Sequence, residues 1–155
     1  MNKTEYWGKD GNRTESLPDH PLLDNMSDTT YHEIEDCTYE IEFYETEDGK
    51  CPVCEFLDSL DPKMKAKVLR TIDLLEANGP VLRKPYSEAI GDGLFELRTK
   101  LGSNITRIFY FFFIGQKAVL TNGFVKKSQK TPKTELDLAK KYKEDYERRY
   151  DNEQL

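Results

Sequence analysis

Residues 93–132 decide the fold, and they read GLFELRTKLGSNITRIFYFFFIGQKAVLTNGFVKKSQKTP. From Arg98 to Lys133 the chain contains eight basic residues and no Asp or Glu. The same stretch holds the densest apolar run of the chain, residues 108–114. A hydrophobic sheet with only positive charge on its wet face is a candidate surface for a polyanion.

Three strands are predicted within this stretch. Residues 93–100 alternate, with Phe95, Leu97 and Thr99 on one face and Glu96, Arg98 and Lys100 on the other. Residues 105–114 are almost continuously aromatic or β-branched, which is typical of a central strand covered on both faces. Gly115-Gln116 is a hairpin signal, and residues 117–125 form the last strand.

The elements before and after these strands complete an α+β pattern. Residues 38–45 alternate as a half-buried strand, and residues 52–60 carry a helical apolar stripe. A second helix begins at Asp61-Pro62 and ends at Asn78-Gly79-Pro80, and residues 81–92 are expected to be a loop. Thr131-Pro132 starts a final helix that reaches about residue 149. The order β-α-α-β-β-β-α predicts a twisted, mostly antiparallel sheet with a helical hairpin on one face, leaving the basic residues on the other.

Charge divides the chain into a tail and one domain. Residues 1–37 hold nine acids and three bases, whereas residues 38–155 hold twenty of each. We expect 1–37 to be an acidic, disordered tail, 38–150 to be the folded domain and 151–155 to be a frayed end. The tail is either an inert extension, with Met26 as an alternative start, or an acidic segment that covers the basic face.

No apolar run is long enough to span a membrane and no signal-peptide pattern is present, so we expect a cytoplasmic protein. Cys51-Pro-Val-Cys54 has the spacing of a redox motif or of half a zinc site, but it is equally the start of a helix at Pro52. The only histidines, His20 and His32, lie in the tail. We therefore expect no metal and no cofactor.

The lack of histidine in residues 38–155 excludes a His–His ribonuclease and a Ser–His–Asp triad. Lys, Arg and Tyr remain as candidates. They are sufficient to cut RNA, because the 2′-hydroxyl of RNA is itself a nucleophile. The protein need only align the backbone, neutralise the transition state and help to move protons.

Three segments together resemble a known family: Gly93-Leu-Phe-Glu-Leu-Arg98, Thr106-Arg107-Ile-Phe-Tyr110, and Gly123-Phe-Val-Lys126-Lys127 continuing to Lys130-Thr-Pro132. The chain is similar over residues 38–150 to the phage-derived, HigB-like branch of the RelE/ParE toxin superfamily. Pro52-Val-x-Glu55-Phe-Leu57 also resembles the start of that family's helical hairpin. The two cysteines and the acidic tail depart from the family pattern.

The resemblance implies the toxin of a type II toxin–antitoxin module that cleaves messenger RNA on the ribosome. By position, the implied catalytic residues are Arg98, Arg107, Lys126, Lys127 and Lys130. Residues expected to contact RNA around them are Lys100, Lys117, Tyr110, Phe124 and Lys133. Structural roles compete at several positions: Tyr110 and Phe124 could be core residues, and the lysines could be solvated strand-end charges.

The resemblance also implies a HigA-like, helix-turn-helix antitoxin as partner, with operator DNA bound only through that antitoxin. Two other functions stay open. One is a ParE-like toxin that poisons DNA gyrase, and the other is a non-catalytic protein that binds RNA or a repressor through the same face.

Overall fold

The computed structural model describes residues 1–10, 38–127 and 130–153. Five strands form one sheet in the order β1-β5-β4-β3-β2, and all neighbouring pairs are antiparallel except β1 and β5. The strands are β1 (Glu40–Phe43), β2 (Ser87–Gly91), β3 (Leu94–Leu101), β4 (Asn104–Phe113) and β5 (Lys117–Val125). The predicted α+β architecture is thus confirmed.

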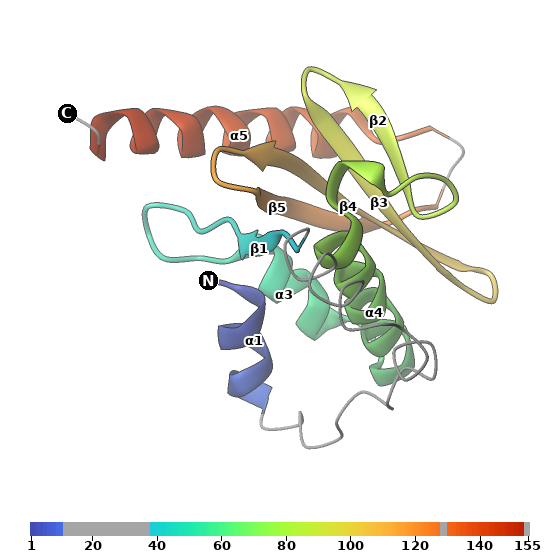
Figure 1. Ribbon diagram of the computed structural model, residues 1–155. Helices are drawn as coiled ribbons and strands as arrows, with labels where there is room; N and C mark the ends of the chain where they lie inside the picture. Colours follow the sequence, from blue (N-terminus) through green and yellow to red (C-terminus); the bar gives the residue numbers. More distant parts are fainter. Residues whose placement is uncertain (11–37, 128–129, 154–155) are drawn as a thin grey trace, which may run out of the picture.

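Helices lie on both faces of the sheet (Figure 1). Helices α3 (Pro52–Ser59) and α4 (Pro62–Asn78) pack on one face, and α5 (Lys133–Glu153) lies across the other. A short 3-10 turn, η1 (Gly79–Val81), follows α4. The second face carries Arg98 and Arg107 as expected, but it is not left open, because α5 covers part of it. Phe109 and Phe111 point to that face and pack with Ala139 of α5.

Local sequence explains the helical hairpin. Pro52 begins α3 with Cys51 as N-cap, and the Asp61 carboxylate accepts hydrogen bonds from the backbone N–H groups of Lys63 and Met64. Such a cap satisfies donors that the first turn cannot pair internally. The helix α3 then approaches β5 so closely that a Cβ at Gly123 would collide with the ring of Phe56.

Two predicted boundaries need correction. The predicted loop 81–92 contains β2, an edge strand that pairs with β3 and has a register shift between Ala89 and Gly91. Its residues, SEAIG, show little β-propensity, so the pairing with β3 determines its structure. At the other end, α5 continues to Glu153, so most of the predicted frayed end 151–155 is helical.

The first ten residues correct the prediction of a disordered tail over 1–37. Residues Lys3–Asp10 form α1, in which Lys3 and Tyr6 are buried against the domain. Residues 11–37, including Met26, lie outside the described residues. Within the described part, no helix combines the length and the apolar character that a membrane span requires.

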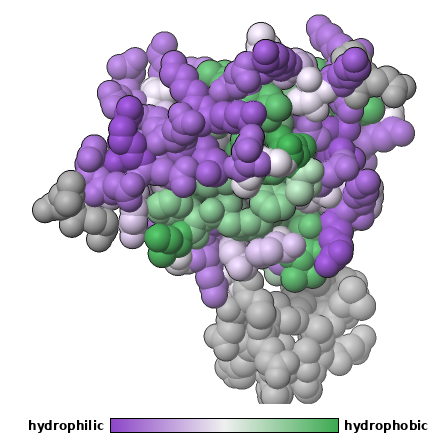
Figure 2. All heavy atoms as spheres, turned by 90° about the horizontal axis from the view of Figure 1, so that it is seen from above, coloured by the Kyte–Doolittle hydropathy of each residue, from purple (hydrophilic) through white to green (hydrophobic). Residues whose placement is uncertain are grey.

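Figure 2 shows the molecule from above the view of Figure 1, the side on which α5 lies. Hydrophilic side chains cover most of this surface, around a smaller area of hydrophobic ones. Only Ala139 of α5 is fully buried. The helix therefore presents its polar side outward and covers the sheet with its tyrosines, Tyr142 and Tyr146.

Candidate functional site

A cleft of about 690 Å³ opens at the edge of β3. The strand β2 pairs with β3 only as far as Leu97, so the following residues of β3 have no strand beside them on that side. Among the residues that the structure describes, five basic residues and no acidic residue line the cleft: Lys67, Lys84, Arg98, Lys100 and Arg107. Its volume is in the range of small-ligand sites, and its charge favours an anion.

The two arginines lie opposite each other across the β3–β4 pairing, on the α5 side of the sheet. Like charges in this position repel each other, and here a buried carboxylate offsets the repulsion. The Glu96 side chain is only 2 % exposed, and its Oε2 lies 3.4 Å from Arg98 Nη2 and 3.5 Å from Arg107 Nε. Thr131 donates a 2.7 Å hydrogen bond to the other oxygen of Glu96.

Arg107 lines the cleft but is itself only 8 % exposed. Burial and then the neighbouring charge of Arg98 lower the pKa of Arg107, while Glu96 opposes them. A guanidinium still remains protonated in proteins, so Arg107 is a fixed positive charge and not a proton carrier.

Both arginines have unused hydrogen-bonding capacity. The buried Nε atoms of Arg98 and Arg107 have no hydrogen-bond acceptor within the described residues. Arg98 also forms an ion pair with Glu88, and Arg107 donates a 3.3 Å bond to the carbonyl of Thr106. The pair is held in place by carboxylates, and both side chains line the cleft, where their remaining N–H groups can donate to an anion such as phosphate.

Lys67, Lys84 and Lys100 supply the outer charge of the cleft. Lys84 lies 3.3 Å from Glu88, whereas Lys67 and Lys100 form no ion pair within residues 1–10, 38–127 and 130–153. Tyr86 contributes an aromatic ring that is 43 % exposed. The Tyr86 carbonyl accepts a 2.7 Å hydrogen bond from the Arg98 backbone N–H, which fixes this loop beside β3.

The lysines that follow β5 lie near this cleft but do not line it. The backbone N–H of Lys126 bonds to the carbonyl of Ile105, a residue of the cleft wall, over 2.8 Å. Lys127, Lys130 and Lys133 are exposed along the connection to α5, in which residues 128–129 are not described. Of the predicted catalytic residues, the cleft thus unites Arg98 and Arg107 and leaves the other three outside its walls.

Three residues predicted to contact RNA are not at this surface. Lys117 starts β5 and pairs with Glu42, at the end of the strand opposite Lys126. Eight steps of a strand put these ends roughly 26 Å apart. Phe124 is 7 % exposed and packs on Phe109. Both residues therefore lie outside the cleft.

Tyr110 is the third of these residues, and its 1 % exposure excludes contact with RNA in this conformation. Its ring stacks on Phe95, and its hydroxyl shares a hydrogen bond with Ser87. Burial raises the pKa of Tyr110, so the side chain stays protonated within the core. The core role that competed with RNA binding is the one observed.

Sequence reasoning missed Lys67, Lys84 and Tyr86. Lys67 belongs to α4 and the other two to the segment before β2, so no local pattern relates them to β3. The one available signal was the aromatic Tyr86 next to Lys84-Pro85 in a predicted loop.

Comparison with known proteins gives one finding. The family model described as phage derived protein Gp49-like (DUF891) matches residues 55–144, which contain α4, the three central strands and every residue of the cleft. No curated protein matches the chain.

Proposed function

Because the chain belongs to the phage-derived Gp49-like family, a RelE/ParE-like toxin family, we propose that it is a HigB-like toxin that cleaves messenger RNA on the ribosome. The observation that carries this proposal is the cleft, whose walls contain five basic residues and no acidic one within the described part of the chain. Such a site fits a phosphodiester better than a neutral or cationic ligand.

In this proposal, the arginine pair holds the scissile phosphate. The RNA 2′-hydroxyl gives its proton to a water molecule and attacks the adjacent phosphorus. The bond from phosphorus to the 5′-oxygen breaks, that oxygen takes up a proton, and a cyclic phosphate and a 5′-hydroxyl result. Arg98 and Arg107 neutralise the charge that grows on the non-bridging oxygens. Since Glu96 already fixes both side chains, little reorganisation is needed when the transition state forms.

Residues around the arginines bind and orient the RNA. Tyr86 offers a ring on which a base can stack, and Lys67 and Lys100 neutralise neighbouring phosphates. The positive surface extends toward α5 through Lys126, Lys127 and Lys130. These lysines guide the RNA strand into the cleft or contact ribosomal RNA. Lys84 and Lys100 line the cleft and are the candidate proton donors to the leaving 5′-oxygen.

The partner of the toxin follows from the same family. A toxin–antitoxin family implies an antitoxin, and we propose a HigA-like protein with a helix-turn-helix that also carries operator binding. An acidic segment of that antitoxin would cover the cleft, so the complex should weaken as salt screens the charges.

The ParE-like alternative uses the same fold to poison gyrase. The cleft holds two neighbouring arginines beside an exposed tyrosine, and this arrangement favours RNA cleavage over gyrase poisoning. Induced expression followed by mapping of RNA 5′ ends separates the two. We expect new 5′ ends within translated regions and no broken chromosomal DNA.

Two alanine variants link that result to the cleft. Lys100→Ala removes an exposed cation of the cleft, whereas Lys117→Ala removes a half-buried cation at the opposite end of the sheet. We expect Lys100→Ala to lose most of the cleavage and Lys117→Ala to retain it. Equal loss in both variants, or DNA breaks without RNA cleavage, would contradict the proposal.

A further inference from the structure

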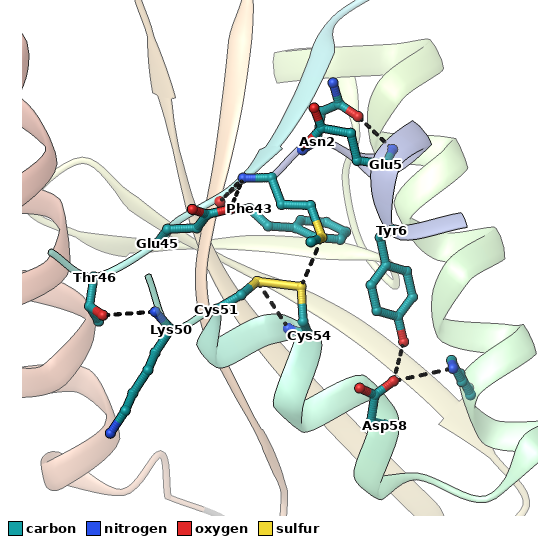
Figure 3. Close-up of a disulfide and its surroundings, with 12 residues drawn as sticks. Asn2, Glu5, Tyr6, Phe43, Glu45, Thr46, Lys50, Cys51, Cys54 and Asp58 are labelled. Atoms are coloured by element: carbon teal, nitrogen blue, oxygen red, sulfur yellow. Dashed lines mark hydrogen bonds and ion pairs between the residues drawn. A yellow bond between two sulfur atoms is a disulfide. The ribbon is translucent and has the colours of Figure 1, made fainter. Parts of the chain in front are cut away.

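Cys51 and Cys54 form a disulfide at the start of α3 (Figure 3). Cys51 is the N-cap residue, Pro52 is the first helical residue and Cys54 lies in the first turn. The backbone N–H of Cys54 points to Cys51 Sγ over 3.3 Å. A sulfur in this position is favoured as a thiolate, because the helix dipole and the N–H group both stabilise negative charge.

The first residues of the chain cover this disulfide. Met1 Sδ lies 3.6 Å from Cys54 Sγ, and the two cysteines are 8 % and 5 % exposed. The N-terminal ammonium group fixes Met1 by an ion pair with Glu45 at 2.6 Å and a hydrogen bond to the Phe43 carbonyl at 3.2 Å.

Partly buried polar contacts hold α1 on the domain. The Lys3 ammonium pairs with Asp73 at 2.6 Å and with Glu76 at 2.8 Å, both on α4. The Tyr6 ring packs against Phe43, and its hydroxyl donates a 2.8 Å bond to Asp58 of α3. Release of α1 must break these contacts together, so its docking behaves as one two-state element.

We propose that Cys51–Cys54 is a reducible redox site and that α1 gates its reaction with dithiols. A dithiol supplies both electrons. Its thiolate attacks Cys54 Sγ, the S–S electron pair leaves on Cys51, and Cys51 then takes up a proton. The second thiol of the reagent attacks the mixed disulfide and releases Cys54, so the protein gains two thiols and the reagent becomes a disulfide.

The direction of attack connects the chemistry to the gate. The better leaving group is the cysteine with the more stable thiolate, which is Cys51. The leaving-group effect therefore favours attack on Cys54, the sulfur that contacts Met1. Reduction then requires α1 to leave first, and the reduction rate reports the fraction of undocked molecules.

The test measures how fast dithiothreitol reduces the full-length protein, with free thiols trapped by iodoacetamide and counted by mass. Lys3→Met keeps the apolar stem but leaves Asp73 and Glu76 without their cation. We expect reduction to accelerate about tenfold, since the substitution removes both ion pairs that join α1 to α4, and Lys3 is their buried partner. Lys63→Met is the matched control: Lys63 is an exposed lysine of α4, and its loss should change the rate less than about twofold.

A second variant guards against misfolding of Lys3→Met. Tyr6→Phe keeps the ring on Phe43 and removes only the hydrogen bond to Asp58, and it should also accelerate reduction. Equal rates in the wild-type protein and both variants would overturn the gate. Failure of oxidised dithiothreitol to re-form the disulfide in the native protein would overturn the redox site itself. Neither result depends on RNA cleavage.

Discussion

Replacing Glu96 with Gln tests whether the buried carboxylate holds the arginine pair together. The substitution keeps the shape and the acceptor for Thr131 but removes the charge that faces Arg98 and Arg107. Loss of one partner of a buried ion pair costs about 3–5 kcal/mol. Arg98 is partly exposed and keeps Glu88, so the loss falls mainly on Arg107. We expect unfolding to become easier by about 2–4 kcal/mol.

For a chain of this size, that loss corresponds to a fall in melting temperature of roughly 5–15 °C. Urea unfolding followed by circular dichroism measures the loss in free energy of unfolding. The control is Glu88→Gln, whose side chain is 34 % exposed and whose loss should cost less than about 1 kcal/mol. Sulfate should restore more stability to Glu96→Gln than to the wild-type protein, because an anion can replace the missing charge. Equal stability of the two variants would refute this reasoning.

Three further predictions concern single side chains. Tyr86→Ala should weaken binding of a short single-stranded RNA by about 1–3 kcal/mol while Tyr86→Phe binds normally, and loss in both variants would exclude stacking. Gly123→Ala should destabilise the protein by about 1–3 kcal/mol in urea, because the new methyl group meets the Phe56 ring; an unchanged midpoint would contradict this packing. Burial raises the pKa of Tyr6 to about 12, above its ordinary value of 10.0, so its contribution to stability is complete below pH 10 and is lost as the pH rises toward 12. Urea midpoints at pH 9 and pH 11 should therefore differ less in Tyr6→Phe than in the wild-type protein, and equal differences would argue against this role.

The strands and helices with clear periodicity could be predicted from the sequence. Residues 105–114 are apolar on both faces, and β4 is indeed covered by α4 on one side and α5 on the other. The side occupied by α5 could not be predicted, because its apolar residues fit either face of the sheet. The strand β2 was missed since its five residues depend on pairing with β3.

The candidate site could be predicted only in part. Alternation along β3 predicted the face on which Arg98 lies, and Arg107 is the single charged residue of β4. The register between β3 and β4 then makes the two arginines neighbours. The alternation also predicted that Glu96 lies on that face. It did not predict that Glu96 is buried between the two arginines. Lys67 and Tyr86 join the cleft through tertiary packing of separate segments, which local patterns do not encode.

The N-terminal segment shows a different limit. Its acidic composition predicted disorder over residues 1–37. Composition is an average over the segment, so it does not reveal the few residues that pack against the domain. Lys3 and Tyr6 each meet a specific partner on α4 or α3, and such pairing is invisible without the fold. The same contacts bring Met1 to the disulfide. The spacing of Cys51 and Cys54 alone was compatible with a redox motif, with half a zinc site or with a purely structural role, and it did not indicate this contact.

The proposed translation-dependent cleavage is tested most directly with purified protein on a defined messenger RNA. The rate of cleavage is compared on translating ribosomes and on the same RNA without ribosomes, for the wild-type protein and for Lys100→Ala. We predict rapid cutting only on ribosomes and a large loss in Lys100→Ala. Equal cleavage of ribosome-bound and naked RNA would contradict the ribosome dependence, and undiminished cleavage by Lys100→Ala would contradict the assignment of the cleft as the active site.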